Sequence, residues 1–458
     1  MTFRRVASAI GAHAGLCAVV ACIVVFCAIY IDLAFYRLHA LLLGIDTGVY
    51  TQALRHFFET GSTDNFGEYR PKLSVHDSWT VFGLAPLVAL FPHASTILIV
   101  GILALAVAAI PLYAFGRVVG LCDWQAAAIA IAYLVEPSAQ GWAFGNFTEA
   151  HFIPLLAFSL AIALRRRSLL WVLILAELLT GIKEDQSLFL IWIALAVVAL
   201  YDLRLAWTLA LVGAANFFGY EAIQRAYGFE AHNPGYRLYD SRWPQHLAFL
   251  VEIAAPFAFA ALYSGRRLVV ALPFVAEITL NAPWPGTREP QQLAIGGWHY
   301  TIPLVTMMAL GVVFVVAERR VFARAMVPAA LVMALLFNPT VVHVGRHRLP
   351  ADWAAYCAAE RIAADRSTRA YYTTDEGFFA IAAANTNVRF VRGKPVDRIG
   401  WWSGRVAPRA NSPQQGCDNV GGGTSTVFAE SAFGERGTRI ARSSARHRRD
   451  DARRRRHR

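Results

Sequence analysis

Apolar residues run along the chain in long stretches that are separated by short polar segments. The hydrocarbon core of a bilayer is about 30 Å thick and takes about 17 to 25 residues to cross as a helix, and shorter stretches qualify inside a bundle. The pattern therefore predicts an all-α polytopic membrane protein with about 11 transmembrane helices. The stretches lie at about residues 14–36, 94–116, 124–137, 150–164, 168–182, 185–201, 205–220, 247–263, 268–283, 300–317 and 325–342.

Arginine residues between these stretches predict the orientation of the chain. Cytoplasmic loops of membrane proteins collect Lys and Arg, and alternating the stretches places five arginine-bearing loops on one side. The first stretch follows Arg4 and Arg5, so we expect a retained signal anchor in a multi-pass plasma-membrane protein whose N-terminus is cytoplasmic. The five loops carry Arg117, Arg165 to Arg167, Arg204, Arg266 with Arg267, and Arg319, Arg320 and Arg324.

A long first outer loop, residues 37–93, separates the first two stretches. Residues 79–92 within it are apolar, but the segment is short and ends in a proline. Counting it as a crossing would move the arginine loops to the outside, so we predict a juxtamembrane helix in the outer interface. A model with twelve crossings is the alternative.

The membrane domain is predicted to cover residues 1–342, and the remainder of the chain has a different pattern. Residues 343–403 combine an amphipathic helix, two short strand-like segments and a second helix, which predicts a small extracytoplasmic α/β appendage. Residues 404–458 are rich in Gly, Ser and Arg without apolar periodicity, so a disordered tail is expected there.

The composition is typical of a membrane protein, and most of the positive net charge comes from one end of the chain. The chain is 56% hydrophobic and only 16% charged, and its formal net charge is +12. Residues 434–458 alone hold eleven Arg against three acidic residues, a net of +8, which leaves +4 for the other residues. Because the excess lies in the tail, no nucleic-acid groove and no nucleic-acid partner are expected.

Ionisable residues gather on the predicted outer side, where polar groups at membrane depth tend to mark functional sites. Each has a structural alternative: Asp46 as a helix N-cap, Lys183 as the partner of an adjacent acid, and His299 with Tyr300 as interfacial anchors. For His76 and Asp77 the structural alternative is that they are ordinary surface residues. The outer loops carry Asp46, His76 and Asp77; Glu136, Asn146, Glu149 and His151; Lys183, Glu184 and Asp185; and His299 and Tyr300.

Four short blocks in these loops carry a resemblance to known families. They are Gly44-Ile-Asp-Thr-Gly-Val-Tyr-Thr-Gln52, Gly145-Asn-Phe-Thr-Glu-Ala-His-Phe152, Lys183-Glu-Asp-Gln186 and His299-Tyr-Thr-Ile-Pro303. With them, roughly residues 14–395 resemble a bacterial polytopic membrane-protein family catalogued as domain of unknown function 2079. An Asp after the first crossing, followed by a long outer loop with an embedded apolar helix, is also similar to the GT-C glycosyltransferases.

The GT-C resemblance implies a mechanism that uses a polyprenyl-phosphate sugar and a cell-envelope acceptor. Asp46 would be the catalytic base that deprotonates the acceptor hydroxyl, and Lys183 or His76 would stabilise the lipid-phosphate leaving group. This chain has Thr47 where many such enzymes have a second acid. The other implied substrate-binding residues are Asp77, Glu149, His151, Glu184, Asp185, His299 and Tyr300, and a divalent ion would be held by Glu149, His151 and Asp77.

Two other functions compete with a glycosyltransferase. A transporter or flippase predicts midplane charges and Gly or Pro breaks within an internal repeat; Glu177, Glu277 and Pro111 are candidates, but no repeat is visible. A non-catalytic membrane assembly protein is the third possibility. No Walker loop, dinucleotide-binding fingerprint or zinc-ligand spacing is present, which argues against a soluble cofactor enzyme.

Overall fold

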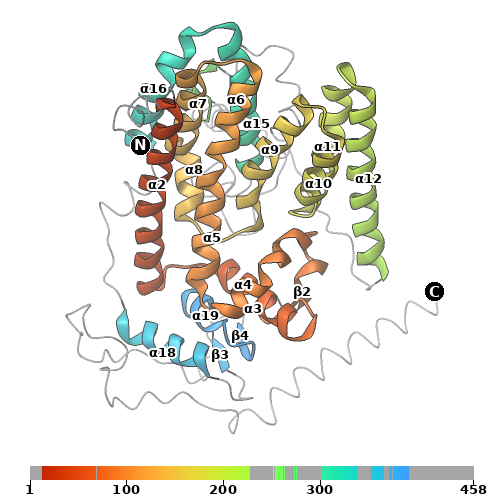
Figure 1. Cartoon of the computed structure of the whole chain (residues 1–458). Coiled ribbons are helices and arrows are strands. Elements are labelled where there is room, and N and C mark those ends of the chain that lie inside the picture. The colour runs from red at the N-terminus through yellow and green to blue at the C-terminus, as the bar shows by residue number, and fades with distance from the viewer. Residues whose placement is uncertain are drawn as a thin grey trace, which may run out of the picture.

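The structure is a computed structural model in which apolar helices form a bundle with a smaller layer at one end (Figure 1). Most of the helices predicted as crossings are present within the described residues. His299, Tyr300, Glu277, the stretch at 268–283 apart from residues 273 and 275, and the tail at 404–458 lie outside the residues that the structure describes. Described are residues 13–68, 70–226, 251, 253–260, 263, 273, 275, 301–337, 352–365, 371–373 and 375–390.

Within the described residues, nine α-helices of the bundle coincide with eight of the predicted stretches, since one stretch forms two helices. Helix α5 and helix α6 together make one apolar segment, Ala94–Val119. The bounds are α2 (Ala14–His39), α5 (Ala94–Val107), α6 (Ala109–Val119), α7 (Asp123–Val135), α9 (Ile153–Arg165), α10 (Leu169–Thr180), α11 (Glu184–Ala196), α12 (Leu203–Ala226) and α15 (Ile302–Glu318). A further helix, α16 (Val321–Phe337), matches the last predicted stretch.

The predicted second outer loop begins later than expected, because helix α8 (Pro137–Phe144) continues the helical segment that starts with α7. At the beginning of α7, the Asp123 carboxylate accepts the Gly15 N–H at the start of α2. At the end of α8, the Phe144 carbonyl accepts from Arg37 near the end of α2. The two helices therefore run beside α2 for most of its length, and Glu136 lies inside the bundle rather than in an outer loop.

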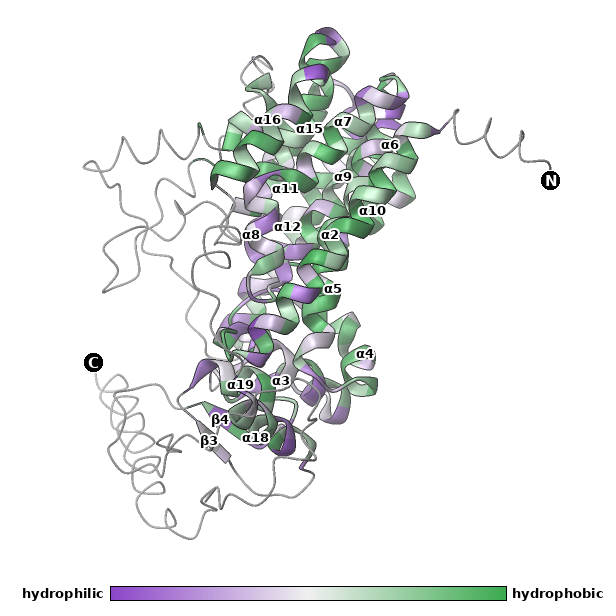
Figure 2. Ribbon diagram, turned by 90° about the vertical axis from the view of Figure 1, so that its left-hand side faces the viewer, coloured by the Kyte–Doolittle hydropathy of each residue, from purple (hydrophilic) through white to green (hydrophobic). Residues whose placement is uncertain are grey.

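Two segments, Ala14–His39 and Ala94–Val119, are each 26 residues long and apolar enough to cross a membrane. The other apolar helices of the bundle are shorter, so the number of crossings stays a prediction. Large apolar side chains are exposed on the outside of the bundle, for example Val24 at 62%, Leu211 at 64% and Leu335 at 74%. Exposed apolar side chains of this kind are expected where a protein faces lipid, and Figure 2 shows that most residues of the bundle helices are apolar.

The segment predicted as an interfacial helix forms two short helices, a 3-10 helix at Trp79–Leu84 and α4 (Ala85–Leu90). It packs beside α3 (Ile45–Thr60) at the end of the bundle that also carries the C-terminal helices (Figure 1). Leu90 and Phe91 at its end are 74% and 60% exposed. A short helix with an exposed apolar tip fits an interfacial position better than a twelfth crossing.

The predicted outer loops meet at one end of the bundle, which we call the appendage end. The hydroxyl of Tyr50 donates to Glu149, and the N–H of Thr80 donates to the Gly181 carbonyl over 2.9 Å. At the opposite arginine end, Arg167 lies 3.7 Å from Asp202. The arginine-bearing loops that the structure describes and the acidic outer loops therefore separate to opposite ends, as the charge pattern predicted.

The described residues of the appendage form two helices and two short strands, and they are docked on α3. Strands β3 (Tyr371–Thr373) and β4 (Val388–Phe390) pair in parallel, and α19 (Glu376–Ala382) connects them; α18 (Trp353–Ala364) precedes them. Gln52 of α3 donates to the Val388 carbonyl over 2.8 Å and accepts the Phe66 N–H over 2.7 Å. A short hairpin of β1 (Asp64–Asn65) and β2 (Arg70–Pro71) lies between α3 and α4 in sequence.

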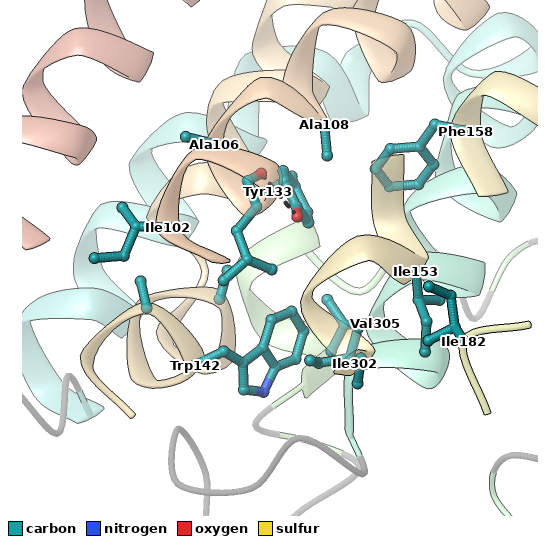
Figure 3. Packing of buried hydrophobic residues seen from close by; sticks show 14 of the residues in the cluster. Ile102, Ala106, Ala108, Tyr133, Trp142, Ile153, Phe158, Ile182, Ile302 and Val305 are labelled. Atoms are coloured by element: carbon teal, nitrogen blue, oxygen red, sulfur yellow. Dashed lines mark hydrogen bonds between the residues drawn. The ribbon is translucent and has the colours of Figure 1, made fainter. Parts of the chain in front are cut away.

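The core of the bundle is formed by small and β-branched residues around a few large rings. Figure 3 shows Tyr133, Trp142 and Phe158 among Ile102, Ile302 and Val305. The hydroxyl of Tyr133 donates to the Leu105 carbonyl over 3.2 Å, and Trp142 Nε1 donates to Thr301 Oγ1 over 2.9 Å. Buried rings with polar atoms therefore find partners, as an apolar interior requires.

The orientation of the bundle can be tested with two single cysteines. Cysteine replaces Thr60, which is exposed at the appendage end, or Arg166, which is exposed at the arginine end. We expect a membrane-impermeant maleimide to label Thr60→Cys in intact cells and Arg166→Cys only after permeabilisation. The background replaces Cys17, Cys22, Cys27 and Cys122 with alanine and leaves Cys357, which is disulfide-bonded, in place. Labelling of the arginine end in intact cells would mean that the orientation is reversed.

The docking of the appendage can be tested at Gln52, whose side chain is 1% exposed. Gln52→Leu keeps the volume but leaves the Phe66 N–H and the Val388 carbonyl unpaired in a buried interface. We expect the variant to lose about 2 to 4 kcal/mol of unfolding free energy, seen as a lower thermal midpoint in detergent. Thr60→Val, at an exposed position of the same helix, should change it by less than about 0.5 kcal/mol.

Candidate functional site

The candidate site begins at the first turn of α3, where Asp46 is the second residue. Gly44, and not Asp46, is the N-cap, so the prediction of Asp46 as a capping residue is wrong. The Gly44 N–H donates to Asn146 Oδ1 over 2.8 Å, and Arg37 donates to the same oxygen over 3.2 Å. A Cβ at position 44 would collide with the Asn146 side chain, so glycine is needed there. Asn146 thus fixes where α3 starts and where Asp46 lies.

Asp46 has a side chain that is partly exposed and uncommitted. Within the residues that the structure describes, its carboxylate makes no hydrogen bond and no ion pair. Burial raises the pKa of Asp46, the neighbouring Lys72 and His76 lower it, and the carboxylates of Glu149 and Glu68 raise it further. The net effect is a raised pKa, which brings the carboxylate closer to the neutral range in which a general base works best.

Thr47 occupies the place of the second acid of many GT-C enzymes, and its side chain faces away from this cluster. It is fully buried, and its hydroxyl oxygen accepts the Phe147 N–H over 3.3 Å. An acid at position 47 would therefore lie against the 147 segment. This turn therefore carries a single carboxylate, that of Asp46, because position 47 is packed against the segment around Phe147.

Lys72 is the cation beside Asp46. Its side chain is almost fully buried, its Nζ lies 3.3 Å from Glu68 Oε1, and the same atom lies 4.6 Å from the centre of the Tyr50 ring. Tyr50 in turn donates its hydroxyl to Glu149. Burial of Tyr50 and the adjacent Glu149 carboxylate raise the pKa of the phenol, which keeps it protonated as a donor. The buried ammonium group of Lys72 is thus paired with Glu68 and also acts electrostatically on Asp46.

His76 connects this cluster to the loop between α10 and α11. Its Nδ1 lies 3.0 Å from Glu184 Oε1, and its charge also acts on Asp46. Although burial opposes it, the charge and hydrogen bond of His76, with help from Lys183, lower the pKa of Glu184 to about 2. Lys183 itself lies 3.3 Å from Asp185 Oδ2, so the pairing of Lys183 with an adjacent acid is confirmed.

The structure keeps His151 apart from the cluster. The two ring nitrogens of His151 are engaged, one accepting the Thr148 N–H over 3.3 Å and the other 3.2 Å from the Trp142 carbonyl. His151 is 4% exposed, so it supports the fold around Gly101 rather than facing a substrate. Of the predicted site residues, Asp46, His76, Asp77, Glu149, Lys183, Glu184 and Asp185 lie in or beside the cluster, and His299 and Tyr300 lie outside the described residues.

A divalent ion would need several oxygen or nitrogen ligands at short range. Among the described residues no group of three or more His, Cys, Asp and Glu side chains is placed to hold one. Asp77, Glu149 and His151 in particular face different partners, so they do not form the ion site that the resemblance implied.

Three residues of the cluster were not predicted as site residues: Tyr50, Glu68 and Lys72. Lys72 carried a usable signal, because it is one of only three lysines in a chain that holds 43 basic residues. Lys183 is another of the three lysines, so the rarity of this residue type could have pointed to both positions. Tyr50 and Glu68 gave no such signal, because their role depends on which loops meet.

An apolar bundle with an exposed apolar exterior, and with polar groups gathered at one end, defines an integral membrane protein. Residues 37–222 match the model of a family described as "Predicted membrane protein (DUF2079)". The match confirms the resemblance to that family and includes the blocks at residues 44–52, 145–152 and 183–186. No curated protein and no solved structure matches the chain, so the GT-C resemblance stays a prediction.

The buried carboxyl of Asp77 predicts a pH-dependent stability. Burial, with the carboxylates of Glu184 and Glu177, raises the pKa of Asp77 to about 7. The neutral form therefore contributes stability that is complete below the unfolded pKa of about 4 and is lost as the pH rises through about 7. The side chain introduced by Asp77→Asn would stay neutral at every pH. Between about pH 5 and pH 8 the unfolding free energy of Asp77→Asn should therefore rise relative to that of the wild type by roughly 1 kcal/mol or more. Thermal midpoints in detergent, measured across this pH range, check the change.

Asp64→Asn is the matched control for Asp77→Asn. Asp64 lies in the same loop, is partly exposed, and accepts a hydrogen bond from Ser62 Oγ over 2.7 Å. A gain for Asp77→Asn that is the same at every pH would contradict the assignment of Asp77 as the titrating group.

Proposed function

We propose that this protein is a GT-C-like glycosyltransferase that uses a polyprenyl-phosphate sugar at the extracytoplasmic face, with Asp46 as the general base. The observation that carries the proposal is the Asp46 carboxylate. It is partly exposed, has no hydrogen-bond or ion-pair partner among the described residues, and lies beside the buried cation Lys72. A carboxylate that the fold leaves uncommitted next to a fixed cation suits proton transfer from a bound hydroxyl.

The reaction would transfer the sugar in one displacement. The acceptor oxygen gives its proton to Asp46 as it forms a bond to the anomeric carbon, and the bond from that carbon to the phosphate oxygen breaks. The electron pair of the broken bond leaves with the polyprenyl phosphate. Negative charge therefore grows on the phosphate, and positive groups held in place beforehand lower the barrier.

Lys72 and His76 are the cations that we assign to the phosphate. Lys72 is held by Glu68 and by the Tyr50 ring, and His76 is oriented by Glu184. Both act electrostatically on Asp46, so both lie on the side of the cluster where the acceptor would react. Lys183 is paired with Asp185, and we assign it to positioning the His76–Glu184 pair.

Exposed apolar side chains near the cluster provide contacts for a lipid substrate. Phe58 near the end of α3 is 56% exposed, and Leu90 and Phe91 after α4 are also exposed. A substrate with a polar head and a long isoprenoid tail would place its head at Asp46 and its tail along this surface.

The test is Asp46→Asn in cells that lack the native copy, with Asp64→Asn as the matched control. We expect the deletion and Asp46→Asn to lose the same envelope glycan and to accumulate its lipid-linked sugar donor, both measured by mass spectrometry. Loss of a general base should slow transfer at least about 100-fold, whereas Asp64→Asn should stay near the wild type. Lys72→Met should reproduce the defect, provided that the variant reaches the membrane in normal amount.

The same experiment separates the competing functions. A flippase would leave the lipid-linked sugar unchanged in structure but on the wrong side of the membrane, where an impermeant probe detects it. If the protein has a non-catalytic assembly role, the deletion strain would show a defect, and expression of the Asp46→Asn variant would fully correct it. An unchanged glycan profile in the deletion strain would contradict the glycosyltransferase proposal.

A further inference from the structure

The turn between α9 and α10 has an arginine at a backbone position that favours glycine. Arg167 has φ +53°, in the left-handed region. Its N–H donates to the Leu164 carbonyl and the next N–H, of Ser168, donates to the Ala163 carbonyl, both over 3.0 Å. This pair of hydrogen bonds is a Schellman motif, in which glycine usually takes the left-handed position because it has no Cβ. The backbone of the turn therefore gives no reason for an arginine at position 167.

The start of α12 has a second arginine at a position that its helix disfavours. Arg204 is the second residue of α12, and the N-terminus of a helix carries a partial positive charge that repels a cation. Asp202 caps this helix, because its Oδ1 accepts the N–H groups of Arg204 and Leu205 over 3.1 and 3.2 Å. Capping and the helix dipole explain the aspartate, but they do not explain Arg204.

These two arginines belong to one corner of the bundle, which we call the arginine corner and define as residues 165–168 and 201–204. Arg167 Nε lies 3.7 Å from Asp202 Oδ2, which joins the two segments. The corner contains four arginines and one acidic residue, a net charge of +3. The Arg167 side chain is 73% exposed, so its pairing with Asp202 is weak and the positive charge stays accessible.

The other three arginines of the corner are also available to a ligand. Arg165, Arg166 and Arg204 are exposed, and within the part of the chain that the structure describes their side chains form no ion pair. Arginine is generally enriched at the cytoplasmic end of a membrane protein. That tendency accounts for positive charge at this end of the bundle, but it does not select the left-handed position of one helix end and the first turn of another.

An apolar stripe begins at the arginine corner and follows α12. Leu203, Trp207 and Leu211 are four residues apart, so they share one face of the helix, and each is 64 to 65% exposed. The neighbouring α10 begins with Leu170 and Trp171, which are also exposed. The two helices lie side by side (Figure 1). Positive charge at one end of an exposed apolar surface matches the two parts of a phospholipid.

We infer that the arginine corner and this apolar stripe bind an anionic phospholipid. Its phosphate lies among the arginine side chains, because a guanidinium group can donate two parallel hydrogen bonds to phosphate oxygens. Its acyl chains lie along α10 and α12. Basic sites between helices on the cytoplasmic side are typical of anionic lipid recognition, and the arginine pattern predicts that this end faces the cytoplasm. The site lies at the opposite end from the Asp46 cluster and does not depend on the glycosyltransferase proposal.

The test titrates the full-length protein in neutral detergent with phosphatidylglycerol or with phosphatidylcholine of the same acyl chains, and measures bound lipid by native mass spectrometry. We expect phosphatidylglycerol to bind the wild type at least about 10-fold more tightly, since it lacks the cationic choline group that the corner repels. Arg166→Gln combined with Arg204→Gln should weaken phosphatidylglycerol binding by about 10-fold or more and change phosphatidylcholine binding by less than about twofold.

A matched control removes the same charge from another loop. Arg320→Gln combined with Arg324→Gln changes two exposed arginines near the turn between α15 and α16, and phosphatidylglycerol binding should stay within about twofold of the wild type. Without lipid, both double variants should keep the thermal midpoint of the wild type. Phosphatidylglycerol should then raise the midpoint of the wild type and of the control but not that of the corner variant, because a ligand of the folded state stabilises it.

Glycerol phosphate separates a phospholipid site from a general anion site, because it carries the phosphate without acyl chains. We expect that it neither raises the midpoint nor displaces phosphatidylglycerol at an equal concentration. Displacement by glycerol phosphate, equal binding of the two lipids, or an equal loss of phosphatidylglycerol binding in both double variants would each overturn the inference.

Discussion

Helix α3 is packed between the helical bundle and the appendage, and the position of the polar cluster depends on this burial. Nine consecutive residues, Thr47 to Arg55, are buried, which is unusual for a helix that lies outside the apolar bundle. Its polar side chains are satisfied on both sides, by Glu149 for Tyr50 and by the appendage for Gln52 and Arg55. Because unpaired buried groups cost free energy, α3 has little freedom to rotate or slide, and Asp46 is held in place.

The appendage end combines an excess of acid with very few cations. Lys72 pairs with Glu68, Glu184 pairs with His76, and Asp46 lies within the electrostatic influence of Lys72, Glu149, Glu68 and His76. Each cation is therefore shared among several carboxylates, and a change at one of them alters the pKa of the others. The clustering follows from the fold, because four segments far apart in sequence are brought to one end by antiparallel and broken crossings.

Hydropathy predicted the helices of the bundle well, because an apolar stretch of sufficient length has few other structures available in lipid. It did not predict the helix after Pro137. Glu136 and the small polar residues around it were assigned to an outer loop, whereas the structure buries them in a second half of the same crossing. Glu177, predicted as a buried acid, is exposed and accepts from Asn216 over 2.9 Å. The positions of the helices could therefore be predicted from the sequence, but the side of each helix that packs against protein could not.

The candidate site shows the same limit. Asp46, His76, Glu149 and Glu184 were identified because they are acidic or basic residues in outer loops. The prediction passed over Lys72, the buried cation beside Asp46, and named Lys183 instead, because sequence gives no distance between residues 46, 72 and 183. Such distances arise from contacts such as those of Asn146 and Glu184, which join segments about a hundred residues apart.

The contact between Gln52 and Val388 spans 336 residues, and this has a consequence for biogenesis. During synthesis the first outer loop emerges early, but the strand that completes its hydrogen bonds is made only near the end of the chain. Until then, the buried polar groups of α3 lack partners and the helix cannot take its final position. In a nascent or truncated protein α3 would therefore lack its fixed position, so the Asp46 cluster is assembled last, when β4 has formed and paired with Gln52.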